Sequence, residues 1–363
     1  MKFKNKLLIL IAIVILILAI SITILIKNSM TGRVIADNNP VKIGFTTALS
    51  GNYAYIGQDV LRGTKDAINE ANEKNILNRK IELIVEDNQA DTKTAVTSYQ
   101  LLKSKGVNII LSSFSSITEA LAPLANQDKI ILMYNAIPTI YAEKYDYVFK
   151  VYSNAPQEAE VIINEIKKSS GKIAVVSVNN PTSAIMKNIF SKELNNFKTY
   201  NFDINDNDFR TIIEKLKEDN IQNIIILGYP KQILNFVKQT VELNYDLKII
   251  YTTSDGGSKD VVNDIESYIK DSGIKYILVG YGKQSKEIYY VFSYDMTKVL
   301  ITGMKACQNL GKNSDDPECL KIELQKVKIN SKSGIINMDN SRIAKLTPKL
   351  YTVKNKEIIV YVG

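Results

Sequence analysis

Residues 108–127 read NIILSSFSSITEALAPLANQ, and this stretch decides the fold. It opens with a short, largely apolar run, Asn108–Leu111, which is typical of a buried strand. The segment Ile117–Gln127 has the pattern of a helix, and a serine-rich turn joins it to the strand. A short strand that leads directly into a helix is the repeating unit of a parallel sheet covered by helices.

The same alternation extends in both directions from this stretch. In the first half we expect strands at Val41–Phe45, Ile81–Glu86, Asn108–Leu111 and Ile130–Tyr134, and helices at Gly57–Glu73, Asp91–Lys105 and Ile117–Gln127. In the middle we expect strands at Lys172–Ser177, Asn223–Leu227, Lys248–Thr252 and Lys275–Val279, and helices at Ser183–Asn195, Phe209–Asp219, Pro230–Asn244 and Lys259–Lys270. Two successive series of similar size predict an α/β protein with two doubly wound, Rossmann-like lobes and a cleft between them.

The pattern changes after Tyr281. We expect a long helix at Lys286–Leu310, a short one at Pro317–Lys326, and turns and short strands over Lys332–Gly363. The two cysteines of the chain, Cys307 and Cys319, bracket the polar loop between these helices. In an exported protein such a pair predicts a disulfide, which would stabilise the fold by about 3 kcal/mol; two unpaired thiols are the alternative.

The N-terminus carries a long apolar segment. Leu7–Ile26 contains two polar residues and is long enough to cross a bilayer as a helix. Three lysines precede it, which favours a cytoplasmic N-terminus and predicts that the remaining chain lies outside. We therefore expect residues 7–26 to form one transmembrane helix that anchors an extracytoplasmic protein to the cell membrane. The alternative is a cleaved signal with a small-residue site at Val34–Ala36, which would give a secreted or periplasmic protein.

The net charge of +8 does not indicate a nucleic-acid-binding protein. Five of the positive charges lie within residues 1–36, and +3 remains once these five are set aside. No cluster of lysine and arginine interleaved with aromatic residues follows. We expect no nucleic-acid partner.

The chain contains no histidine, which removes the commonest general base and the commonest metal ligand. Catalytic systems that pair serine or cysteine with histidine are therefore excluded. Neither a phosphate-binding loop nor a GxGxxG dinucleotide fingerprint occurs. These absences argue against an enzyme, and we expect no cofactor and no metal.

Small polar residues gather after the expected strands, where open α/β sheets bind ligands. The clearest group is Ser112–Glu119, directly ahead of a helix, where hydroxyl and free amide groups suit a bound carboxylate. Simple N-capping by Ser115 or Ser116 is the alternative. Thr139, after the next strand, would add a hydroxyl.

In the second half, the tip Ser254–Gly257 follows the strand that ends at Thr252. Its acid, Asp255, would pair with a ligand ammonium if it faces the cleft; otherwise it is a turn aspartate. Tyr229 follows Leu227-Gly228 and belongs either to the cleft wall or to the surface. Together these positions describe one site, with carboxylate donors on one lobe and a carboxylate acceptor on the other.

At these residues the chain resembles the branched-chain amino-acid-binding family of type I periplasmic solute-binding proteins. The resemblance covers about Val41 to the end and rests on the order and spacing of several individually weak motifs. These motifs are Val41–Gly51, Glu86-Asp87-Asn88, Ser115–Pro123, Lys129–Met133 with Thr139, and Ser333–Asp339.

The resemblance implies a set of ligand contacts. The positions implied for the ligand α-carboxylate are Ser116, Thr118 and Thr139, with the backbone of Ile137, and those implied for the ligand ammonium are Tyr229 and Asp255. The acid is an aspartate where a longer glutamate is common in the family. Family members often carry aromatic residues where this chain has Ile56 and Thr182, and Tyr53 and Tyr55 are candidate cleft aromatics instead.

The resemblance also implies interlaced lobes joined by a hinge, with chain crossings near Ala155, Tyr281 and Lys345. We expect residues 37–155 and 282–345 to form lobe 1, and residues 156–281 and 346–363 to form lobe 2. The implied function is the extracytoplasmic solute-binding component of an ABC importer for an amino acid or similar zwitterion, with permease and ATPase subunits as partners.

Other functions remain open at this point. An amide, urea or small aromatic acid would be an alternative solute. A ligand-sensing receptor ectodomain is a second class. It would have to act through a partner membrane protein, because the roughly six residues before the apolar segment are too few for a cytoplasmic signalling domain. An enzyme of the doubly wound class is a third, which the missing histidines disfavour.

Overall fold

The computed structural model describes residues 39–281 and 287–362, together with Ser21. The expected transmembrane helix, residues 7–26, and the alternative cleavage site at 34–36 lie outside these residues. Within the described part of the chain, no helix has the length and apolar character that a membrane crossing requires.

The first half of the chain forms a parallel five-stranded sheet in the order β2-β1-β3-β4-β5. Its strands β1, β3 and β4 are almost wholly buried because helices cover both faces, which explains their nearly continuous apolar sequences. The bounds are β1 Val41–Thr47, α2 Ala54–Glu73, β2 Ile81–Asp87, α3 Thr92–Ser104, β3 Ile109–Ser112, α4 Ser115–Asp128, β4 Ile131–Tyr134, α5 Ile140–Lys144 and β5 Val148–Lys150.

A second sheet has seven strands in the order β15-β14-β10-β9-β8-β6-β7. Strands β6 to β10 run parallel, and the C-terminal pair β14 and β15 adds to one edge in antiparallel fashion. The bounds are α6 Ala155–Ile166, β6 Lys172–Val178, α7 Pro181–Glu193, β7 Lys198–Phe202, α8 Arg210–Glu218, β8 Ile221–Leu227, α9 Pro230–Glu242, β9 Ile249–Thr252, the 3₁₀ turn η1 Ser254–Gly257, α10 Lys259–Ile269, β10 Lys275–Tyr281, β14 Pro348–Lys354 and β15 Glu357–Val360.

The segment between β10 and β14 returns to the first sheet. Its long helix α11 lies along α2, and the two backbones approach so closely that a Cβ on Gly63 would lie 2.3 Å from the carbonyl oxygen of Tyr290. The bounds are α11 Ile288–Asn309, α12 Pro317–Glu323, the 3₁₀ turn η2 Leu324–Lys326, β11 Lys328–Ser331, β12 Gly334–Met338 and β13 Ala344–Lys345. The predicted Cys307–Cys319 disulfide is present and joins α11 to α12.

The chain thus passes between the two sheets after β5, after β10 and after β13. The fold is the predicted α/β architecture with two sheets covered by helices. The exact division into lobes, at residues 155, 281 and 345, stays a prediction.

The sequence interpretation missed five of the helices and strands that the structure describes: α5, β5, α6, β7 and β11. Strands β5 and β7 are difficult to predict because β5 has three residues and β7 is an edge strand with mostly exposed side chains. Helix α6, in contrast, carries a regular apolar stripe of Ala159, Ile162, Ile163 and Ile166, so the signal was present.

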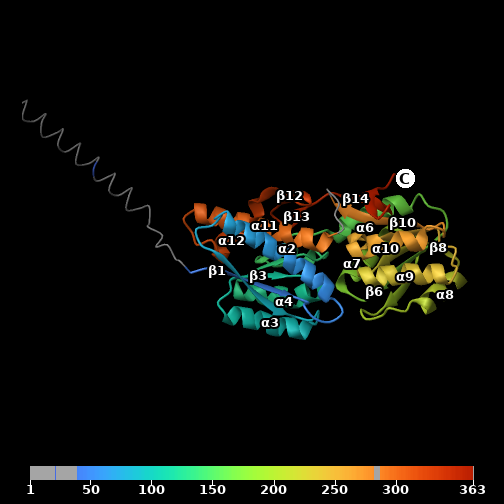
Figure 1. The fold of residues 1–363 in the computed structure, drawn as a ribbon, viewed down its shortest axis with the longest axis horizontal. Coiled ribbons are helices and arrows are strands. Elements are labelled where there is room, and N and C mark those ends of the chain that lie inside the picture. The colour runs from blue at the N-terminus through green and yellow to red at the C-terminus, as the bar shows by residue number, and fades with distance from the viewer. Residues whose placement is uncertain (1–20, 22–38, 282–286, 363) are drawn as a thin grey trace, which may run out of the picture.

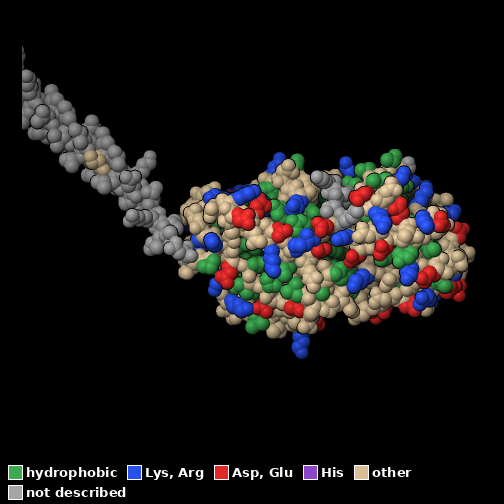
Figure 2. Space-filling model, viewed as in Figure 1, with side chains coloured by type: hydrophobic (Ala, Val, Ile, Leu, Met, Phe, Trp, Pro, Cys, Tyr) green, Lys and Arg blue, Asp and Glu red, His purple; other side chains and the backbone are tan. Residues whose placement is uncertain are grey.

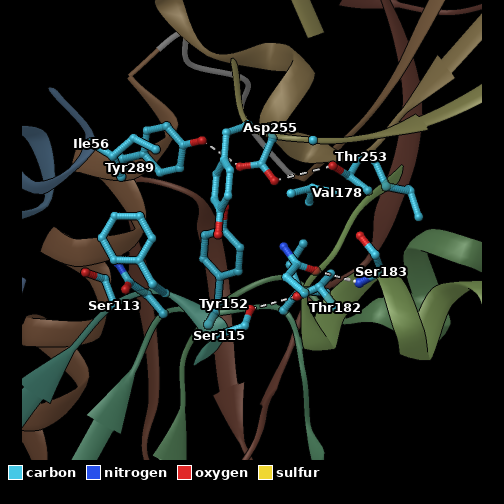
Figure 3. A pocket seen from close by; sticks show the side chains of 18 of the residues that line it. Ile56, Ser113, Ser115, Tyr152, Val178, Thr182, Ser183, Thr253, Asp255 and Tyr289 are labelled. Atoms are coloured by element: carbon cyan, nitrogen blue, oxygen red, sulfur yellow. Dashed lines mark hydrogen bonds between the residues drawn. The ribbon is translucent and has the colours of Figure 1, made fainter. Parts of the chain in front are cut away.

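Charged side chains of both signs are exposed on the face shown in Figure 2, where lysine and arginine are intermixed with aspartate and glutamate. The expectation that the protein has no nucleic-acid partner stays a prediction.

Candidate functional site

A cavity lies between the two sheets, beyond the carboxyl ends of their strands. This is the place where open α/β sheets position ligands. The lining residues are Ile56, Val60, Ser113, Phe114, Ser115, Asn135, Ala136, Ile137, Tyr152, Val178, Asn180, Thr182, Ser183, Leu227, Gly228, Tyr229, Thr253, Asp255 and Tyr289.

One wall is the turn between β3 and α4. Strand β3 ends in the buried Ser112, and the helix begins at Ser115, so Ser113 and Ser115 face the cavity at the helix N-terminus. The Ser113 hydroxyl shares a 2.7 Å hydrogen bond with Thr47 on the neighbouring strand β1, which fixes its position. The first turn of any helix has amide groups without intrahelical partners, so this wall can accept a negatively charged group.

The opposite wall carries Asp255, in the 3₁₀ turn that follows β9. Its Oδ1 accepts a 2.6 Å hydrogen bond from the Tyr289 hydroxyl, and its Oδ2 accepts a longer one, 3.4 Å, from Thr253. The pKa of Asp255 is raised to about 7, because burial in the cavity wall, with a smaller contribution from the charge of Glu158, outweighs the lowering by the hydrogen bonds from Tyr289 and Thr253. Among the lining residues that the structure describes, Asp255 alone is an acidic or basic side chain.

Aromatic side chains close one side of the cavity. The rings of Tyr53 and Tyr229 meet edge to face at 4.9 Å, and Phe114 contacts both at slightly above 6 Å. Tyr53 and Phe114 belong to the first sheet's part of the molecule, whereas Tyr229 follows β8 of the second. The Tyr53 hydroxyl also donates to the carbonyl oxygen of Ile204, which follows β7. These contacts join the two walls across the cleft.

A second contact crosses the cleft on the polar side. The Ser115 hydroxyl and the Thr182 hydroxyl lie 2.7 Å apart, which connects the N-terminus of α4 to that of α7. Asn180 caps α7 through a hydrogen bond from the amide of Ser183, so both helices present their first turns to the same cavity.

A cluster of buried polar side chains lies next to the cavity, at a point where the chain passes from one sheet to the other. Glu158 accepts hydrogen bonds from the hydroxyls of Ser254 and Tyr281, at 2.9 and 3.1 Å, and burial raises its pKa. Lys150, also fully buried, donates to the carbonyl oxygens of Tyr152 and Ser153, and burial lowers its pKa to about 7. Ser254 is the immediate neighbour of Asp255, so this group supports the turn that carries the acid.

The structure places three of the six predicted ligand contacts, Ile137, Tyr229 and Asp255, on the cavity wall. Their role in ligand binding stays a prediction.

The other three predicted contacts, Ser116, Thr118 and Thr139, do not line the cavity. Thr118 lies inside α4, where its hydroxyl donates to the carbonyl of Phe114 at 2.9 Å. Ser116 is one position beyond Ser115, a rotation of about 100° on a helix, so Ser115 faces the cavity in its place. Thr139 precedes α5, two residues beyond Ile137.

The two candidate cleft aromatics differ in their position relative to the cavity. Tyr53 contacts the cavity residues Phe114 and Tyr229, whereas Tyr55 lies to one side, with the Lys231 ammonium 4.6 Å from its ring centre.

Two lining aromatics, Tyr152 and Tyr289, were missed by sequence reasoning. Tyr152 follows the end of β5 by two residues and was missed because β5 was not predicted, whereas Tyr289 lies in the first turn of α11. A rule based on the ends of the predicted strands finds neither position. No group of three or more cysteine, aspartate or glutamate side chains in the described residues is arranged to hold a metal ion.

Comparisons with known proteins agree with this fold. The family model described as periplasmic binding protein matches residues 40–266. A Leu/Ile/Val-binding protein of Citrobacter freundii is 23% identical over 215 residues, which are 55% of this chain and 57% of that protein. The chain therefore matches a little more than half of the length of this curated relative.

Two solved structures show the same fold over nearly the whole length. A leucine-binding protein of Thermotoga maritima superposes with a TM-score of 0.77 at 19% identity, covering 89% of this chain and 98% of that one. An ABC-transporter solute-binding protein of R. palustris in complex with benzoate superposes with a TM-score of 0.76 at 15% identity, covering 89% and 95%.

Proposed function

Because the chain belongs to the periplasmic binding protein family, we propose that it is the extracytoplasmic solute-binding protein of an ABC importer. Its solute is an amino acid or a similar small zwitterion, bound in the cavity between the two sheets. The partners are a permease and an ATPase, and residues 7–26 attach the protein to the membrane.

The proposal rests on one observation: the two walls of the cavity suit ligand groups of opposite charge. Asp255 supplies a negative charge on one wall, and the N-terminus of α4, with Ser113 and Ser115, supplies hydrogen-bond donors on the other. A solute with an ammonium at one end and a carboxylate at the other satisfies both walls at once. An anion alone would leave the Asp255 carboxylate without a positively charged partner, at a cost that burial increases.

The mechanism is capture without chemistry. The solute enters when the two halves are apart, and its two charged ends then join the walls, so the closed form is favoured by the difference in affinity between the open and closed states. The contacts Tyr53–Tyr229 and Ser115–Thr182 contribute to the closed form from the protein itself. The permease would recognise this closed form.

A small aromatic acid is the second candidate solute. The lining contains four aromatic residues, Phe114, Tyr152, Tyr229 and Tyr289, and the R. palustris relative was solved with benzoate. An aromatic acid would bind best when Asp255 is protonated, and a pKa of about 7 permits this at mildly acidic pH. The two candidates therefore have opposite pH dependences.

The test is a thermal-shift screen of residues 37–363 against the amino acids, amides, urea and small aromatic acids, with the wild type and Asp255→Asn. A solute that binds only the native state raises the Tm. We expect an amino acid to stabilise the wild type and to lose this effect in Asp255→Asn. If only uncharged or acidic solutes stabilise both proteins equally, the amino-acid proposal fails.

The screen does not separate an importer from a sensor. Co-purification of the full chain from membranes with a permease and an ATPase would support the importer. Co-purification with a signalling protein alone would instead identify the chain as a receptor ectodomain.

A further inference from the structure

The helix α11 reaches the cavity with its first turn, at Tyr289. The helix packs along α2 on the side of the first sheet, whereas Asp255 follows β9 of the second sheet. The 2.6 Å hydrogen bond from the Tyr289 hydroxyl to Asp255 Oδ1 therefore crosses between the two parts of the molecule.

The other groups around Asp255 do not supply a comparable donor. Thr253 is 3.4 Å from Oδ2, and Glu158 is an acid whose charge disfavours a second carboxylate nearby. The remaining titratable neighbours are four tyrosines: Tyr55 in α2, Tyr152 in the connection after β5, Tyr229 after β8 and Tyr276 in β10. Among the described lining residues there is no lysine or arginine.

We propose that Tyr289 is a positioning residue, whose hydroxyl, donated across the cleft, holds the Asp255 carboxylate in place as an ionised acceptor for a ligand amine. The consequence for ligand binding rests on the function proposed above. The hydrogen bond and its effect on the ionisation of Asp255 are independent of that function. A tyrosine hydroxyl donates to the ionised carboxylate and stabilises this form over the neutral acid.

Removal of the hydroxyl has a defined effect on Asp255. Hydrogen bonds to charged groups are among the stronger ones in proteins. The loss of this hydrogen bond should therefore raise the pKa of Asp255 by about one unit, which is a tenfold change in its acid dissociation constant. Asp255 would then titrate clearly above 7 in Tyr289→Phe, and at neutral pH most molecules would carry the neutral acid. The aromatic ring, which packs in the cavity wall, is retained.

The test needs no ligand. The pKa of Asp255 is measured by carbon-13 NMR of the carboxyl group in the wild type and in Tyr289→Phe. Tyr290→Phe is the matched control, because the adjacent Tyr290 hydroxyl donates to the exposed Asp66 outside the cavity, at 3.0 Å. We expect a midpoint near 7 in the wild type and in the control, and a midpoint about one unit higher in Tyr289→Phe.

The pH dependence of the Tm gives a second readout. An acid with a raised pKa in the folded state contributes stability at low pH that is lost as the pH rises through that pKa. The loss should extend to higher pH in Tyr289→Phe, so its Tm difference from the wild type changes between pH 6 and 8.5. A constant difference, together with an unchanged Asp255 midpoint, would show that Tyr289 only packs.

These outcomes are independent of the solute. If the NMR midpoint moves as expected but no amine-bearing solute binds, the positioning role stands and the proposed solute class fails. If an amino acid binds and the midpoint does not move, the solute class stands and the positioning role fails.

Discussion

The hydroxyl of Tyr53 offers a direct test of closure across the cleft. It donates to the carbonyl oxygen of Ile204 on the other side of the cavity. Tyr53→Phe removes this hydrogen bond and keeps the ring contacts with Phe114 and Tyr229. The change therefore acts on the closed form alone, because in an open form the hydroxyl would bond to water.

The magnitude follows from the partners that remain. The Ile204 carbonyl also accepts from Gln232 Nε2 at 2.8 Å, so the variant leaves no buried acceptor without a partner. The expected cost is that of one neutral hydrogen bond, about 0.5–1.5 kcal/mol. Since a ligand that requires closure must supply this difference, its Kd should rise about two- to twelvefold. Burial raises the pKa of Tyr53 to about 12, so the ratio should stay constant from pH 6 to 9.

The assay is isothermal titration calorimetry with the amino acid that best stabilises the wild type. Tyr290→Phe is the matched control, because the Tyr290 hydroxyl donates to the exposed Asp66 outside the cavity. We expect Tyr53→Phe to bind more weakly and Tyr290→Phe to bind as the wild type does. Equal affinities of the two variants, or tighter binding by Tyr53→Phe, would refute the assignment of this contact to the closed form.

Three further predictions concern stability. A Cβ on Gly57 would lie 1.6 Å from a backbone oxygen in the loop after β1. Gly57→Ala should therefore lower the free energy of unfolding, measured in urea, by about 3 kcal/mol. Gln58→Ala, on the exposed face of the helix, should leave it unchanged. Replacing Cys307 and Cys319 with serine opens a loop of twelve-residue separation, and the free energy of unfolding should fall by about 3 kcal/mol; an unchanged Tm would show that the bond adds nothing. Lys150→Met leaves two buried carbonyl oxygens without their ammonium donor, which should cost about 2 kcal/mol in the same urea assay.

The fold could be predicted because buried parallel strands have a simple sequence pattern. Runs such as Ile109–Ser112 are apolar on both faces, and helices of regular period follow them. Edge strand β7 does not follow this rule, because its side chains mostly face solvent. Its existence depends on pairing with β6, which local sequence does not encode.

The candidate site was predictable only in part, for a related reason. Asp255 and Tyr229 follow strands, and the carboxyl ends of parallel strands meet at one edge of a sheet. Tyr289 and Tyr152 reach the cavity only through the way the chain crosses between the sheets. The choice of Ser115 over Ser116 depends on the rotation of α4 about its axis, which the register of the turn sets.

The binding of three ligands to the wild-type protein, measured by calorimetry at pH 7.5, tests the proposed site most directly. They are the amino acid selected by the screen, its N-acetyl derivative, which lacks the ammonium, and its amide, which lacks the carboxylate. We expect the amino acid to bind and each derivative to bind at least about tenfold more weakly, because each loses one charged contact. Equal binding of the amino acid and its N-acetyl derivative would show that Asp255 does not receive a ligand amine in this cavity.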